Sequence, residues 1–97
     1  MNTFETTLNH YHKNLELYVP VVDRVHGASH PEFHEVKQLF DVMNEKLKSE
    51  NRKSLNLEED FKALRDITSN YTVPGDVCES YEAVYNMLED LDKAYEA

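Results

Sequence analysis

Four segments of this chain carry apolar residues at steps of four and three, the spacing of helices that have one apolar face. The first and last stripes consist of Phe4, Leu8, Tyr11, Leu15, Tyr18, Val22 and Val25, and of Val77, Tyr81, Val84, Leu88, Leu91 and Tyr95. The two between them consist of Phe33, Val36, Phe40, Met43 and Leu47, and of Leu57, Phe61, Leu64, Ile67 and Tyr71. Such faces are buried when helices pack together, so the sequence predicts an all-α, antiparallel four-helix bundle.

The length of the chain predicts a single domain over residues 1–97. Helix-start and helix-stop signals set the expected bounds of its helices. The expected helices cover residues 3–25, then start at residues 31, 57 and 77, with the third shorter than the others. Asp76, with Glu79 three residues later, is expected to cap the last helix. Pro20 lies inside the first helix and predicts a kink there.

The charge balance excludes several classes of partner. The chain has 19 acidic and 10 basic residues, for a net charge of −9, and no local basic cluster. This surface disfavours both phosphate backbones and anionic membranes. One cysteine cannot form an internal disulfide, and there is no apolar leader, so we expect a soluble, cytoplasmic protein.

Three of the five histidines are spaced four residues apart, which invites a metal-site interpretation. His26, His30 and His34 would share one face of a continuous helix. Gly27 and Pro31 interrupt that helix. We therefore expect these imidazoles to lie in an exposed loop and at a helix start.

The remaining polar groups do not suggest an internal catalytic or metal centre. Every stripe position is apolar or tyrosine, so nothing faces inward to bind metal. His12 and Glu16 have the spacing used in di-iron bundles but flank the stripe, which indicates a surface ion pair. Cys78 is expected in the first turn of the fourth helix as a half-buried structural thiol. Acidic runs such as those at 58–60 and 89–92 are expected to be solvated, and with no nucleophile–base pair in view we expect no enzyme.

Two stretches carry a family resemblance. Residues 25–32 read Val-His-Gly-Ala-Ser-His-Pro-Glu, and residues 66–71 read Asp-Ile-Thr-Ser-Asn-Tyr. Both resemble the hemerythrin-like C-terminal domain of the Ric/ScdA family of bacterial iron–sulfur cluster repair proteins. The resemblance implies a hemerythrin-like bundle, a non-haem di-iron centre with His and Glu ligands, and a role after nitrosative or oxidative stress.

The family's ligands are mostly missing from this sequence. Glu5 and Glu50 fall at two ligand-equivalent positions, Ser54 falls at a third, and the ligands of the fourth helix would lie beyond residue 97. The resemblance then implies a ligand-depleted member without a metal cofactor. We expect a protein-binding or regulatory module, with a full-length repair protein as its partner and His26, His30 and Tyr85 as interface residues.

An alternative keeps iron in the function. A divergent iron-binding protein could still take part in cluster repair if its remaining carboxylates and imidazoles rearranged, or if a homodimer completed the site. The candidate ligands for that arrangement are Glu5, Glu50, His10, His12 and Glu16. A short third helix that leaves apolar surface uncovered also favours a homodimer.

Overall fold

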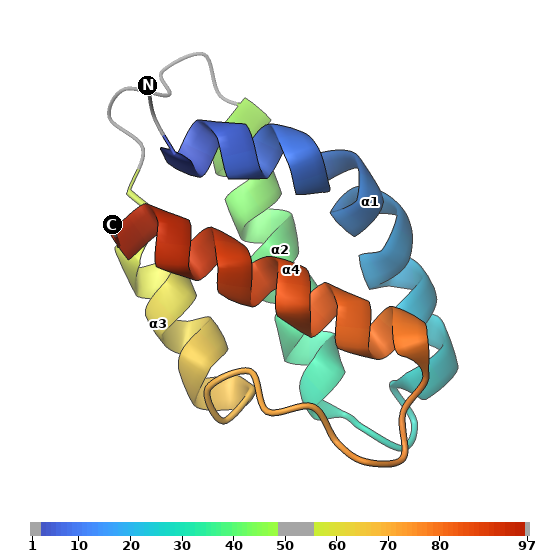
Figure 1. Ribbon diagram of the computed structural model, residues 1–97. Helices are drawn as coiled ribbons and strands as arrows, with labels where there is room; N and C mark the ends of the chain where they lie inside the picture. The colour runs from blue at the N-terminus through green and yellow to red at the C-terminus, as the bar shows by residue number, and fades with distance from the viewer. Residues whose placement is uncertain (1–2, 49–55, 97) are drawn as a thin grey trace.

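The structure is a computed structural model that describes residues 3–48 and 56–96. Within these residues the chain forms four α-helices and no strand (Figure 1). The helices are α1 (Thr3–His26), α2 (Glu32–Lys48), α3 (Glu58–Ile67) and α4 (Glu79–Glu96). The all-helical prediction is confirmed, and α3, with 10 residues, is the shortest of the four.

The helices pack into a body with principal extents of 38 × 22 × 22 Å. Helix α1 packs along α4 and α2, and α2 packs against α3 (Figure 1). At the start of α1, the Phe4 ring lies 5.4 Å from the Tyr95 ring near the end of α4. At the other end of α1, the His26 ring lies 5.5 Å from the Tyr81 ring in the first turn of α4. The two longest helices therefore lie side by side over most of their length.

The apolar stripes form one continuous core, with one correction in α1. Leu15, Val19 and Val22 are buried, Tyr18 is half-buried and Val25 is 62% exposed. The prediction that Tyr18 and Val25 face the core was therefore wrong for Val25, and it missed Val19. At 3.6 residues per turn, a strict four-and-three register drifts by about 20° per heptad and leaves the core after a few turns.

Helix α1 is bent along its length, as Figure 1 shows. Pro20 lies inside it. Proline removes one amide and crowds the carbonyl of the preceding turn, so a bend in this helix has an identifiable cause. Pro20 and Val21 are exposed, which places the proline side of α1 away from the core.

Helix α4 begins later than expected, at Glu79 rather than after Asp76. The Asp76 carboxylate is used elsewhere, because its Oδ1 lies 3.0 Å from Nε2 of His30. The first backbone bond of the helix runs from the Glu82 amide to the Cys78 carbonyl, at 3.2 Å. Cys78 therefore sits at the entrance of α4 and is exposed, so the expectation of a half-buried thiol inside the first turn was wrong.

Helix α3 begins at Glu58, one residue after the predicted start. Leu57 occupies the N-cap position, and the side chain of the preceding Asn56 accepts a hydrogen bond from the Glu58 amide, at 3.1 Å. Among residues 3–48 and 56–96, no helix combines the length and hydropathy that a bilayer crossing requires.

Candidate functional site

The end of the molecule where α1 meets α2 gathers three histidines, each with a different partner. His26, the last residue of α1, places Nε2 3.0 Å from Sγ of Cys78. The His26 ring also meets the edge of the buried Tyr81 ring. This contact ties the end of α1 to the segment that leads into α4. Sequence reasoning missed this imidazole–thiol pair because 52 residues separate its members.

His30 lies in the turn between α1 and α2 and bridges two carboxylates. Nε2 lies 3.0 Å from Oδ1 of Asp76, and Nδ1 lies 3.2 Å from Oε2 of Glu32. Its ring packs at 68° against that of Tyr81. His30 therefore holds the segment before α4 against the start of α2.

His34 contacts α1 from the first turns of α2. Its Nδ1 lies 2.5 Å from Oδ1 of Asp23. This close contact lacks hydrogen-bond geometry, since the same buried oxygen has no hydrogen-bond partner among the described residues. A Cβ at Gly27 would lie 2.4 Å from both the His34 ring and the Asp23 carbonyl oxygen, so this close approach requires glycine.

The three imidazoles thus contact different side chains: Cys78 for His26, Glu32 and Asp76 for His30, and Asp23 for His34. The helix break predicted from Gly27 and Pro31 is confirmed, because α1 ends at His26 and α2 starts at Glu32. In the described part of the chain, no group of three or more His, Cys, Asp and Glu side chains is arranged to hold a metal ion.

The other metal candidates lie on the surface or outside the described residues. His12 and Glu16 lie 3.9 Å apart on α1, and His12 Nε2 also lies 2.5 Å from Oδ1 of Asn44 on α2. The Asn44 amide donates to Glu16, and this hydrogen bond is the main cause that lowers the pKa of the Glu16 carboxyl. Glu5 is exposed, and Glu50 lies outside the described residues.

Tyr85 is a core residue rather than a surface residue. Its side chain is 1% exposed, and its ring lies 4.8 Å from that of Tyr81. The two hydroxyl oxygens lie 3.0 Å apart. Burial raises the pKa of both phenols. Tyr85 therefore offers little surface to a partner protein, in contrast to its expected interface role.

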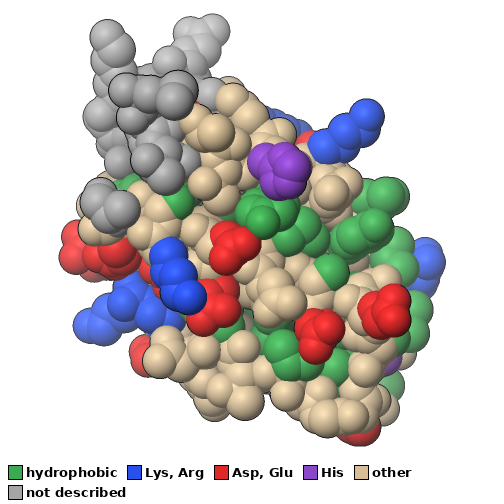
Figure 2. Space-filling model, in the orientation of Figure 1, with side chains coloured by type: hydrophobic (Ala, Val, Ile, Leu, Met, Phe, Trp, Pro, Cys, Tyr) green, Lys and Arg blue, Asp and Glu red, His purple; other side chains and the backbone are tan. Residues whose placement is uncertain are grey.

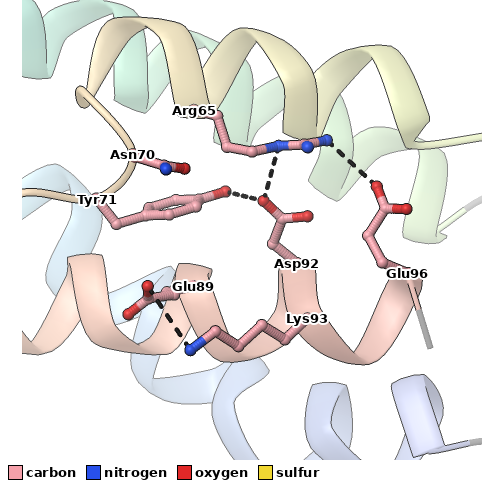
Figure 3. Close-up of a pocket in the computed structure, with 7 residues that line it drawn as sticks. All are labelled: Arg65, Asn70, Tyr71, Glu89, Asp92, Lys93 and Glu96. Atoms are coloured by element: carbon pink, nitrogen blue, oxygen red, sulfur yellow. Dashed lines mark hydrogen bonds and ion pairs between the residues drawn. The ribbon is translucent and has the colours of Figure 1, made fainter.

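A second polar cluster lies between α3 and α4 and lines an open pocket of about 380 Å³, drawn in Figure 3. Asp92 is 5% exposed, which corrects the expectation that the whole acidic run 89–92 is solvated. The Tyr71 hydroxyl donates to Asp92 at 2.8 Å, and Nε of Arg65 lies 3.1 Å from the same oxygen. Burial, followed by this hydrogen bond, raises the pKa of Tyr71 well above its ordinary range.

Asp60 in the other acidic run, 58–60, is also buried, and Lys46 donates a hydrogen bond to it at 2.6 Å.

The turn that delivers Tyr71 to this cluster has an uncommon backbone. Ser69, Asn70 and Tyr71 have φ values of 51°, 64° and 63°. The left-handed region costs about 1 kcal/mol for a residue other than glycine, and less for asparagine. The Thr68 hydroxyl stabilises the turn by accepting from the Tyr71 amide at 2.8 Å and donating to the Leu64 carbonyl at 2.6 Å.

The outer side of α1 presents the main exposed apolar surface of the described chain. Leu17, Val21 and Val25 are 61%, 36% and 62% exposed and follow one another at i, i+4 and i+8. Figure 2 shows hydrophobic side chains gathered over the second half of α1, at the right of the view. Pro20 and Ala28 are exposed beside them. We call this surface, completed by Lys13 and Arg24, the α1 outer face.

The residues of this surface are visible in the sequence, but their spacing did not predict an exposed apolar face. Leu17 and Val21 lie outside the predicted stripe, and Val25 was assigned to the core. A four-residue repeat of exposed apolar side chains on one helix is unlike the scattered apolar residues of an ordinary surface and is typical of a contact region.

Comparison with known proteins adds no relative: no family model, no curated protein and no solved structure matches this chain.

Proposed function

We propose that this chain is a non-catalytic protein-binding module and that the α1 outer face is its contact surface. The observation that carries the proposal is the exposed series Leu17, Val21 and Val25. A partner helix placed along this series would remove three large apolar side chains from water. Burial of exposed apolar area stabilises a complex by roughly 25 cal/mol per Å² before the costs of association.

The contacts between helix ends support an antiparallel bundle as the scaffold. Besides the α1–α4 contacts, Asn44 near the end of α2 meets His12 in α1, and His34 near the start of α2 meets Asp23 late in α1. We propose that this bundle is of the hemerythrin-like type, on the strength of the motif at residues 25–32. The family's repair role would then pass to this chain as a regulatory or assisting role, with a full-length repair protein as a candidate partner.

A metal-free bundle fits the side chains that occupy the interior of α1. Its most buried positions carry Leu15, Val19 and Val22, whereas the carboxylates Glu5 and Glu16 are exposed. A di-iron centre needs imidazoles and carboxylates inside the bundle, where protein excludes water and fixes their geometry.

The contact surface is tested by comparing three immobilised baits in a bacterial lysate. The baits are the wild-type protein, the double variant Leu17→Asp/Val21→Asp, and the control Val42→Asp. Val42 is 48% exposed on α2, so its substitution places one added negative charge on an exposed apolar position of a different helix. We expect proteins recovered by the wild type and the Val42→Asp control to be lost from the double variant. The same proteins on all three baits would contradict the proposed surface.

The metal-free scaffold is tested by iron content after anaerobic incubation with ferrous ion and desalting. The proposal expects near-zero iron per chain. Retention of about two irons, typical of a carboxylate-bridged centre, with a visible oxo-bridged spectrum, would instead support the alternative of a divergent iron-binding repair protein. Glu5→Gln and Glu50→Gln would then be expected to abolish retention.

A further inference from the structure

We propose that the α1 outer face binds an acidic amphipathic helix of another protein. The inference rests on the proposed function and names the chemistry of its partner. Two features carry it: the cations of the face form no ion pair with any residue that the structure describes, and the acids of α1 lie on a different edge of the helix.

The cations of the face are Lys13 and Arg24. Lys13 lies one turn before Leu17, and Arg24 lies one turn after Val21, so both belong to the apolar side of the helix. Both are exposed, and neither forms an ion pair with any described residue. By contrast, Lys46 and Arg65 each pair with a carboxylate of α3 or α4.

The acids of α1 all lie on one edge, away from this face. Glu5, Glu16 and Asp23 are separated by nearly whole numbers of helical turns, so they share that edge. Glu16 pairs with Lys48 at 3.4 Å, and Asp23 pairs with His34, which identifies the edge as the one beside α2. On the opposite side, Asp90 of α4 accepts from the Tyr11 hydroxyl at 2.8 Å. The α1 outer face is therefore apolar and cationic in a protein whose net charge is −9.

A helix is the shape that fits this surface. The apolar series from Leu17 to Val25 spans about 12 Å at 1.5 Å per residue, which is slightly more than two helical turns. A partner helix with apolar residues at i, i+4 and i+7 would cover it. Asp or Glu residues flanking that stripe would meet Lys13 near one end and Arg24 near the other.

Charge argues against two other occupants. A second copy placed on a two-fold axis through Val21 would bring the Lys13 and Arg24 side chains of both copies into one interface with no α1 acid between them. Like charges across an interface disfavour that complex. An anionic membrane would extend beyond this face and meet the acidic remainder of a protein whose net charge is −9, whereas a single helix contacts the face alone.

The test selects binders from a displayed library of random peptides on four immobilised baits. These are the wild type, Val42→Asp, Leu17→Asp/Val21→Asp, and Lys13→Glu/Arg24→Glu. The wild type and Val42→Asp are expected to enrich peptides with apolar residues at helical spacing and flanking Asp or Glu. The charge-reversed bait is expected to enrich Lys- or Arg-flanked peptides instead. One peptide enriched on the wild type is then synthesised and titrated by fluorescence anisotropy. We expect it to bind Lys13→Glu/Arg24→Glu at least about tenfold more weakly than it binds the wild type.

Other outcomes overturn the inference. Basic peptides on the wild type would retain the contact surface but reject its acidic partner, so this failure is distinct from failure of the proposed function. Peptides that also bind Leu17→Asp/Val21→Asp, or no enrichment at all, would reject both. A concentration-dependent dimer in light scattering that Leu17→Asp/Val21→Asp abolishes would make a second copy the occupant. Binding to phosphatidylglycerol vesicles that Lys13→Glu/Arg24→Glu abolishes would make it a membrane.

Discussion

The polar cluster between α3 and α4 and the three histidines at the α1–α2 end make similar contacts at different depths. Asp92 is 5% exposed; it accepts a hydrogen bond from the Tyr71 hydroxyl at 2.8 Å and lies 3.1 Å from Nε of Arg65. His30 makes contacts of similar length with Glu32 and Asp76, yet the Asp76 side chain is 74% exposed. A carboxylate removed from water depends on its partners, whereas an exposed one can exchange them for water.

This difference separates a stabilising cluster from an adjustable one. Breaking a contact of Asp92 leaves polar groups without water or partner, which is costly. Breaking a contact of Asp76 leaves a solvated carboxylate. The histidine end therefore positions a loop at little energetic cost, while the Asp92 cluster holds α3 to α4.

The largest effect is expected when the buried carboxylate itself is removed. Asp92→Ala would leave the Tyr71 hydroxyl without its acceptor and Arg65 without its closest carboxylate. We expect a loss of about 3 kcal/mol in the free energy of unfolding, at the lower end for a buried pair because Arg65 is partly exposed. Urea unfolding followed by circular dichroism measures this loss. Asp90→Ala, which removes an exposed carboxylate of the same helix, is the control, and equal losses would erase the proposed contrast.

A smaller effect, with a pH signature, is expected for Tyr71→Phe. Removal of one neutral hydroxyl should cost about 1 kcal/mol at neutral pH, because Asp92 keeps Arg65. The raised pKa of Tyr71 means that the folded state keeps this proton at a pH where the unfolded chain loses it. The stability that depends on this proton is therefore fully present below the ordinary tyrosine pKa of 10.0 and falls as the pH rises above it. Urea midpoints across that range should decline less steeply in Tyr71→Phe; parallel curves would exclude Tyr71 as a cause.

A gain in stability is expected at the turn that carries Tyr71. Ser69 has φ of 51°, a conformation that glycine adopts without a Cβ penalty. Ser69→Gly should stabilise the fold by about 0.5–1 kcal/mol. Asn70→Gly is the matched control and should gain less, because asparagine tolerates this region. The thermal midpoint measures both, and a loss for Ser69→Gly would mean that the serine side chain stabilises the turn.

The smallest effect is expected at the histidine end. His30→Ala removes contacts with two carboxylates that remain accessible to water, so we expect a loss below about 1 kcal/mol. Amide hydrogen exchange of residues 72–78 should nonetheless become faster, since His30 links this segment to α2. A loss as large as that of Asp92→Ala would show that depth does not separate the two clusters.

The sequence predicted the elements better than their polar contacts. The bounds of α1 and α2 follow from the apolar spacing and from Gly27 and Pro31, because backbone geometry acts over a few residues. The late start of α4 could not be read in the same way. Asp76 has the sequence context of a helix cap, but its carboxylate pairs with His30, which is 46 positions away in the chain. A capping pattern spans only a few residues, so it does not show that a side chain distant in the sequence competes for the carboxylate of the predicted cap.

By itself, the sequence determined an all-helical chain with four apolar faces, an acidic surface and a break between His26 and Glu32. The tertiary structure decided which apolar residues stay exposed, which acids are buried, and which partners the histidines and Cys78 take. Val19 and Val25 are the same residue type on one helix, yet Val19 is fully buried and Val25 is 62% exposed. Propensity and periodicity operate along one helix, whereas burial depends on how the bent α1 lies against α2 and α4.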